Sequence, residues 1–260
     1  MADMIIVEPI DLNYGAGVPF LTVSEGTGGA NLTTPDPREI WVGANNVGVK
    51  SFEIDLGFDR TIDTLFLGNT NVDASSLWSL TSGTNAQGSP VTIRFEAVAM
   101  LMPGDDVAQV RSPVFYRLAV PIIARYLRVQ TYKPAGAFIE VGNLIVGNSW
   151  KPTLPRELGA GRLVADSGAR TRLEGGGLAS VSGSLVSGFK WVFGDLDDAD
   201  LAKLWGIMRR RKTTEPIVLI EDPGALVVEG VHYGTLVNLE GYERNVQSKS
   251  RWVLQMEDWI

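Results

Sequence analysis

Short segments in which apolar and polar residues alternate run along most of the chain. They occur at residues 51–58, 61–68, 91–100, 124–132 and 137–147. In the first of these, Phe52, Ile54 and Leu56 share one face, as in a strand with one buried side. Strands at this spacing, with loops between them and no helix, predict a β-sandwich or jelly roll.

The pattern changes around residues 147–158, where two prolines occur without apolar periodicity. We therefore predict a boundary between a jelly-roll domain at residues 1–148 and a second domain at residues 149–260. The second domain again shows short strands with glycine turns. The predicted fold class is mostly β, with two β domains, of which the C-terminal one carries a single amphipathic helix.

That helix is predicted at about residues 198–211. Its apolar stripe is Leu201, Leu204, Trp205 and Met208, at helical spacing. Acids precede it and cations end it, which suits the helix dipole. Helix capping explains the acids better than a calcium loop, because the glycine and terminal glutamate of such a loop are missing. These acids are Asp195, Asp197, Asp198 and Asp200.

Composition and charge narrow the class of protein. The 260-residue chain has no cysteine, which excludes disulfides and thiolate metal sites. Its net charge is −7, so nucleic-acid binding would require a local basic patch. No stretch is long and apolar enough for a signal segment or a membrane span, and we expect neither.

Catalytic motifs are not apparent in the sequence. The single histidine, His232, lacks a local nucleophile and orienting group and is expected at a turn or strand edge. The glycine-rich stretches fit neither the dinucleotide nor the phosphate-loop fingerprint. We expect no enzyme activity, no cofactor and no metal. The alternative, a glycan-acting enzyme with two carboxylates close only in space, stays open.

Two features are candidates for binding. The cations Arg209, Arg210 and Arg211 form either a solvated helix end or a contact with an acidic neighbouring subunit, with nucleic acid as a third alternative. Trp78 follows Asn69 and Asn71 in a segment rich in amides and hydroxyls, which is typical of sugar or protein recognition. Core packing is the alternative role of Trp78.

Residues 30–147 resemble the discoidin-like, galactose-binding-like jelly rolls. The resemblance rests on NLTTPDPREIWVGAN with Trp41, SFEIDLGFDRTIDTLFLGNTN, ARYLRVQ and FIEVGNLIVG, in that order. Members of this family bind glycans, lipids or proteins through loops at one end of the sandwich and are rarely catalytic. Their loop residues vary, so the resemblance assigns no ligand-contact residue.

Residues 150–260 resemble small β-domains of phage tail-tip and baseplate proteins. The matching segments are FKWVFGDLDDADLAKLWGIM, KTTEPIVLIEDP, HYGTLVNLEGYERN and RWVLQMEDWI. Distal tail proteins also combine an assembling domain with a jelly roll, in the reverse order. The resemblance implies a phage tail subunit, assembled in the host cytoplasm and located in the virion.

The sequence thus leaves two main hypotheses. In the first, the chain is a non-enzymatic tail-tip or baseplate subunit that forms a homo-oligomeric ring and contacts other phage tail proteins. Repeated identical subunits need complementary faces, which a basic helix end on an acidic chain provides. In the second, the chain is a carbohydrate- or receptor-binding module whose partner is a host-surface glycan.

Overall fold

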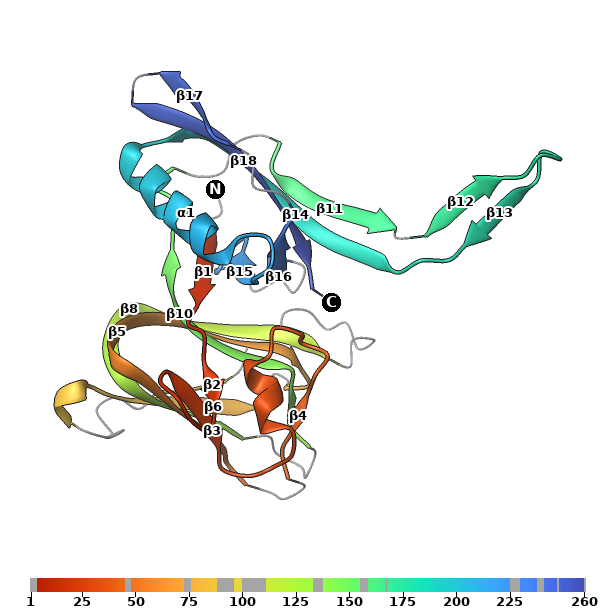
Figure 1. Ribbon diagram of the computed structural model, residues 1–260. Helices are drawn as coiled ribbons and strands as arrows, with labels where there is room; N and C mark the ends of the chain where they lie inside the picture. The colour runs from red at the N-terminus through yellow and green to blue at the C-terminus, as the bar shows by residue number, and fades with distance from the viewer. Residues whose placement is uncertain are drawn as a thin grey trace. The chain divides into compact units, whose positions relative to one another are not determined.

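A computed structural model shows two compact units (Figure 1). The N-terminal unit comprises Ala2–Lys151 with Val218–Val231, and the C-terminal unit comprises Pro152–Ile217 with His232–Ile260. The structure describes residues 4–44, 48–72, 76–87, 96–99, 111–132, 138–154, 159–166, 168–224, 230–237, 241–246 and 248–259. Strands dominate both units and the described residues contain one α-helix, so the predicted fold class is confirmed.

The N-terminal unit is built mainly from antiparallel strands, with one short parallel pair. They are β1 (Ile5–Pro9), β2 (Asn13–Tyr14), β3 (Phe20–Val23), β4 (Trp41–Val42), β5 (Lys50–Thr70), β6 (Leu77–Gly83), β7 (Glu96–Ala99), β8 (Ser112–Tyr132), β9 (Glu140–Val141) and β10 (Asn143–Trp150). Of the strand predicted at residues 91–100, residues 91–95 and 100 lie outside the described residues. Two 3-10 helices, Gly29–Thr33 and Asn85–Gln87, lie in the connections.

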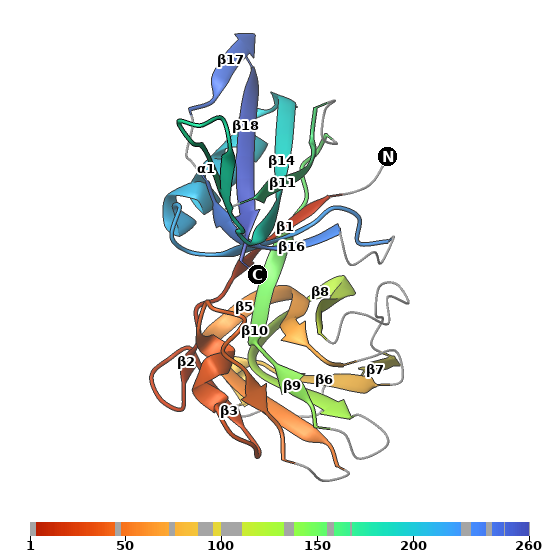
Figure 2. The same ribbon diagram turned by 90° about the vertical axis from the view of Figure 1, so that its right-hand side faces the viewer.

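The two long strands, β5 and β8, give this unit its sandwich form. Their pairing is interrupted between Asp55 and Arg60, which separates each strand into two segments. The first segment of β5 and the last segment of β8 lie in a layer with β3 and β6. The other two segments pair with each other beside β10 and β1, as Figure 2 shows. A strand that bends in this way can serve two packed layers.

Both layers bury side chains in the same core. Phe52 and Ile54 enter it from the first segment of β5, and Leu65 and Leu67 enter it from the second. Trp41, which is fully buried, packs edge-on against Phe52 at 5.0 Å between ring centroids. The alternation seen in the sequence is therefore the inner face of a jelly-roll sandwich.

A segment distant in the sequence completes the edge of this unit. Strand β15 (Ile217–Ile220) lies antiparallel to β1, with Ile5 opposite Ile220 and Val7 opposite Val218. All four residues of β15 are buried. The boundary predicted at residues 147–158 includes the division after Lys151, but the segment from Val218 to Val231 belongs with the N-terminal unit.

The C-terminal unit is a smaller antiparallel sheet with one helix. Its strands are β11 (Gly161–Asp166), β12 (Ala169–Arg172), β13 (Leu178–Val181), β14 (Leu185–Leu196), β16 (Val231–Leu236), β17 (Glu243–Val246) and β18 (Lys249–Asp258). Strand β18 lies between β14 and β16 and also pairs with β17. Strands β12 and β13 pair only with each other and extend the β11–β14 hairpin outward (Figure 1).

The predicted helix forms as α1 (Asp198–Arg211). The side chain of Asp197 caps it by accepting a hydrogen bond from the Asp200 amide at 2.8 Å. Leu201, Leu204 and Met208 are buried as predicted. Trp205, in the same stripe, packs on the buried Trp252 at 5.7 Å between ring centroids, while 43% of its surface stays exposed. Within the described segments, no helix is long and apolar enough to cross a membrane.

Candidate functional site

The two predicted binding features are Trp78 with the loop before it and the arginine cluster at residues 209–211, and they differ in how far the structure exposes them. Trp78 lies in β6 with 5% of its surface exposed, and its ring packs edge-on against Tyr116 at 5.2 Å between centroids. Its indole therefore belongs to the core, the alternative that the sequence left open. A partner contact of the loop before Trp78 stays a prediction, because residues 73–75 lie outside the described residues.

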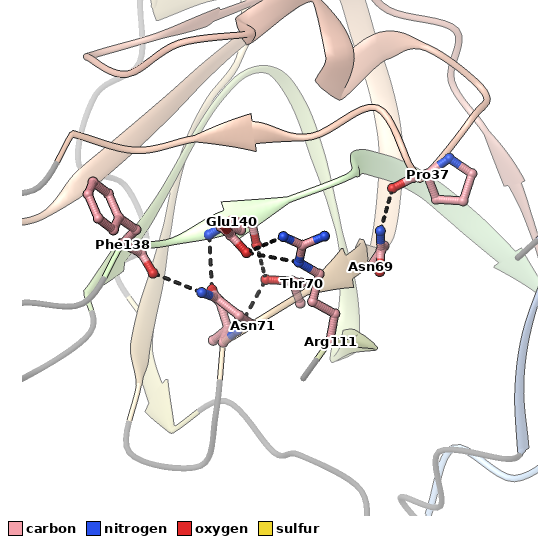
Figure 3. Close-up of polar contacts among 8 residues, drawn as sticks. Pro37, Asn69, Thr70, Asn71, Arg111, Phe138 and Glu140 are labelled. Carbon is pink, nitrogen blue, oxygen red and sulfur yellow. Dashed lines mark hydrogen bonds and ion pairs between the residues drawn. The ribbon is translucent and has the colours of Figure 1, made fainter. Parts of the chain in front are cut away.

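Asn69 and Asn71 hold neighbouring loops at the end of β5. The Asn69 side-chain amide donates to the Pro37 carbonyl at 2.7 Å, from a residue with a positive φ of 47°. Asn71 donates to the Phe138 carbonyl at 2.9 Å and accepts from the Glu140 amide at 2.9 Å. These bonds join three separate chain segments (Figure 3).

Thr70 strengthens this junction, because its hydroxyl donates to the Glu140 carbonyl at 2.6 Å. On the other side of Asn69, Arg38 holds the loop around Pro37 by donating through Nε and Nη2 to the Asp36 carboxylate, at 3.0 and 2.8 Å. Hydrogen bonding from Arg38 lowers the pKa of Asp36 below its ordinary value of 3.8. The carboxylate that holds this turn is therefore charged at neutral pH.

An ion pair and an exposed aromatic ring lie on this framework. Arg111 donates to Oε2 of Glu140 from Nε at 2.8 Å and from Nη2 at 2.6 Å. Their side chains are 32% and 23% exposed, and Phe138, two residues before Glu140, is 46% exposed. We call the residues Asn69–Asn71, Arg111 and Phe138–Glu140 the loop platform (Figure 3).

The ion pair of the loop platform keeps further hydrogen-bonding capacity. Both donated bonds reach the same oxygen of Glu140, so Oε1 of Glu140 and Nη1 of Arg111 have no partner within the described part of the chain. Both atoms belong to partly exposed side chains.

Most of this site was not predicted from the sequence. The alternation at residues 137–147 buries Ile139 and Val141, and it places Phe138 and Glu140 on the outer face. This signal was available in the sequence. Arg111 had none, because only the fold brings this residue, which precedes β8, to Glu140.

His232 does not take part in the loop platform. It lies in β16, with its side chain 4% exposed, and its Nδ1 is 3.0 Å from Oδ2 of Asp258. Ser187 donates to the same carboxylate oxygen at 2.6 Å. The carboxylate thus lies between serine and histidine, whereas nucleophilic catalysis requires the histidine to contact the serine. His232 is buried within the sheet, and the expectation of a turn or strand edge was wrong.

The arginine cluster is divided between surface and interior. Arg209 and Arg210 are exposed at the end of α1. Arg211 is 5% exposed and donates to Glu215 at 3.1 Å across one helical turn. A contact with a neighbouring subunit stays a prediction, and only Arg209 and Arg210 present their side chains at the surface of the chain. The described residues contain no group of three or more potential metal ligands.

Comparison with known proteins finds likeness in structure only. No family model matches the chain, and no curated protein matches it. A chitosan-binding module of a chitosanase/glucanase from Paenibacillus sp. IK-5 has a TM-score of 0.41 and 18% identity, covering 55% of this chain and 99% of the module. A fucose-binding module from Streptococcus pneumoniae has a TM-score of 0.39 and 11% identity, covering 54% of this chain and 98% of the module.

A fucosidase from Ruminococcus gnavus is also similar, with a TM-score of 0.38 and 15% identity. The likeness covers 52% of this chain and 26% of the fucosidase. All three TM-scores are low, so the assignment of the N-terminal unit to the jelly-roll class rests on its own strand pairings and core.

Proposed function

We propose that the N-terminal unit is a non-catalytic carbohydrate-binding module and that the loop platform holds the glycan. The observation that carries this proposal is the exposed Phe138 ring two residues before Glu140, which forms a partly exposed pair with Arg111. A sugar ring has one face rich in C–H groups, which packs on an aromatic ring, and hydroxyls at its rim. Adjacent charged donors and acceptors bind such hydroxyls strongly.

The backbone beneath these groups supports the proposal. The side chains of Asn71 and Thr70 bind the main chain of Phe138 and Glu140, so the aromatic ring and the carboxylate are carried on a fixed segment. A site ordered before binding loses less conformational entropy when the ligand arrives. Glycans offer little apolar area, and their binding benefits from such preorganisation.

The test is a glycan array with the full-length protein, followed by calorimetric titration of the best glycan. Phe138→Ala should weaken binding by about tenfold or more, as expected for loss of an aromatic contact at the centre of a site. Phe58→Ala is the matched control, since Phe58 is 60% exposed in the same unit but lies at the bend of β5, where it packs against Arg60. Equal affinity of the Phe138 variant and the wild type would refute the proposal.

A second candidate function is a phage tail-tip or baseplate subunit, located in the virion. Support comes from the motifs of residues 150–260 and from Arg209 and Arg210, which are exposed on a chain of net charge −7. The test is incorporation of an Arg209→Glu, Arg210→Glu double variant into tail particles. Arg211 is left unchanged, because its substitution would disrupt the pair with Glu215 inside the unit. Normal incorporation would count against these residues as a subunit contact.

A further inference from the structure

We propose that the hairpin extension of the C-terminal unit docks on a second copy of this chain, by reciprocal exchange between two subunits. We call residues 161–188 the arm: strands β11 and β12, a tip, and strand β13 with the first residues of β14 (Figure 1). The inference does not depend on glycan binding. It concerns the other unit and a protein partner.

The outer half of the arm has no core of its own. All eight residues of β12 and β13 are exposed, and these strands pair only with each other. A two-stranded ribbon is marginally stable in water without packing on one face. Yet the tip is well formed, with the Leu173 amide donating to the Gly177 carbonyl at 2.8 Å and Gly176 at a φ of 81°. A ribbon of this kind is stabilised when another surface covers it.

The arm presents one apolar face and one basic face in its outer half. Residues directly opposite in an antiparallel pair point to the same side. Ala169 lies opposite Val181, and Thr171 lies opposite Ala179, which forms the apolar face. The basic face contains Arg170 and Arg172, with their partners Ser180 and Leu178. This division is typical of a sheet that buries one side.

The inner half of the arm extends the core face of its sheet beyond the core. Arg162 lies opposite the buried Phe189, and the next pairs on that side are Val164 with Ser187 and Asp166 with Leu185. Val164 and Leu185 are 67% and 71% exposed, although their strands are continuous with the core. The apolar side chains on this face therefore continue past the point at which the chain itself covers them.

Two observations identify a second copy as the occupant. The arm carries three arginines (162, 170 and 172) and two acids (166 and 174), while the whole chain has a net charge of −7. An arm of opposite charge is attracted to the acidic body of another subunit. Strand β11 also ends its sheet, and the outer edges of β12 and β13 are unpaired, which leaves backbone groups for strand addition.

The size of the arm favours reciprocal exchange. At about 3.3 Å per residue, residues 161–172 span about 40 Å, and a two-stranded ribbon is about 10 Å wide. One covered face then removes roughly 800 Å² from solvent, counting both partners, which is the size of a crystal contact. Two exchanged arms remove roughly 1,600 Å², the usual size of a specific interface. We therefore expect a dimer in which each copy contributes its arm.

The experiment compares the full chain with a variant that lacks the outer half of the arm. Asp166 lies directly opposite Leu185, so Asn-Gly in place of residues 167–184 closes the hairpin with a two-residue turn. Light scattering over a wide range of protein concentration should give twice the 28.2 kDa chain mass for the wild type and one chain mass for the variant. A monomeric wild type, or a variant that remains dimeric, would overturn the proposal.

A second measurement covers the case in which the shortened variant does not fold, as judged by circular dichroism. The chain has no cysteine, so a spin label at an Ala179→Cys position, on the apolar face opposite Thr171, reports only on the outer ribbon. We expect an immobilised label in the dimer and a mobile one after Val181→Asp, which places a charge on the apolar face. A label that is mobile in the unaltered arm would refute docking. If each monomeric variant keeps the glycan affinity of the wild type, docking of the arm and glycan binding by the loop platform are independent.

Discussion

The loop platform and the arm both expose apolar side chains, but they do so in different settings. Phe138 lies on a segment fixed by hydrogen bonds from Asn71 and Thr70 and has charged groups beside it. The arm exposes a row of apolar side chains along a ribbon with no core. A single ring within a polar frame suits a small polar ligand, whereas an extended apolar edge suits another polypeptide. The surroundings of an exposed apolar residue thus indicate what it binds.

The largest expected effect concerns the base of the arm, where Asp258 contacts both Ser187 of β14 and His232. Asp258→Ala should destabilise the C-terminal unit by about 3 kcal/mol, because it removes this partner from a buried imidazole and a partly buried hydroxyl. The measurement is urea unfolding followed by the fluorescence of the buried tryptophans.

Asp198→Ala is the control for this change. Asp198 is 68% exposed and pairs with Arg244 at 3.2 Å, so its loss should cost about 1 kcal/mol or less. Equal effects of the two substitutions would show that the buried cluster does not anchor the arm. The arm would then lack the fixed base that the loop platform has.

The next largest expected effect concerns the rigidity of the loop platform. Asn71→Ala removes the bonds to the Phe138 carbonyl and the Glu140 amide and should cost about 1–3 kcal/mol of stability. It should also increase hydrogen exchange of residues 138–141. Asn13→Ala, which removes one exposed bond to the Pro19 carbonyl, should cost less. Unchanged exchange in the Asn71 variant would contradict the platform as a rigid element.

The smallest expected effect is on acid stability of the N-terminal unit. Hydrogen bonding from Arg125 is the main cause that lowers the pKa of Asp55 below 3.8. A lowered pKa in the folded state stabilises the unit above the unfolded pKa of about 3.9, and this contribution is lost as pH falls through the folded value. Asp55→Asn should therefore be less stable than the wild type at neutral pH, with the difference shrinking in acid.

Arg125→Gln should show the same shrinking difference, because it removes the other half of the pair. Thermal unfolding at a series of pH values measures both variants. A difference that stays constant with pH would show that the ion pair does not set the acid response. The platform and the arm are expected to be unaffected, since Asp55 lies near the bend of β5.

Local patterns predicted the elements that local forces form. The alternation at Phe52, Ile54 and Leu56 predicted an inner face, and all three side chains are buried. The acids and cations around α1 predicted its bounds, because capping and the helix dipole act within one turn. Trp205 shows the limit of such patterns: its helical spacing is correct, but exposure depends on what the sheet leaves uncovered.

Contacts between segments distant in the sequence determined the loop platform and the exposure of the arm. Arg111 meets Glu140 only because the start of β8 pairs with the end of β5, where Thr70 contacts Glu140. Asn71 holds Phe138 across 67 positions of the sequence. The arm likewise shows the alternation of an ordinary strand pair in its sequence. Only the fold shows that no layer of its own chain covers it, because burial depends on which segments meet in space rather than on the order of residues within one segment. The amino-acid sequence by itself determined the strands, the helix and the acidic charge, and the tertiary structure decided which of their faces are left to bind.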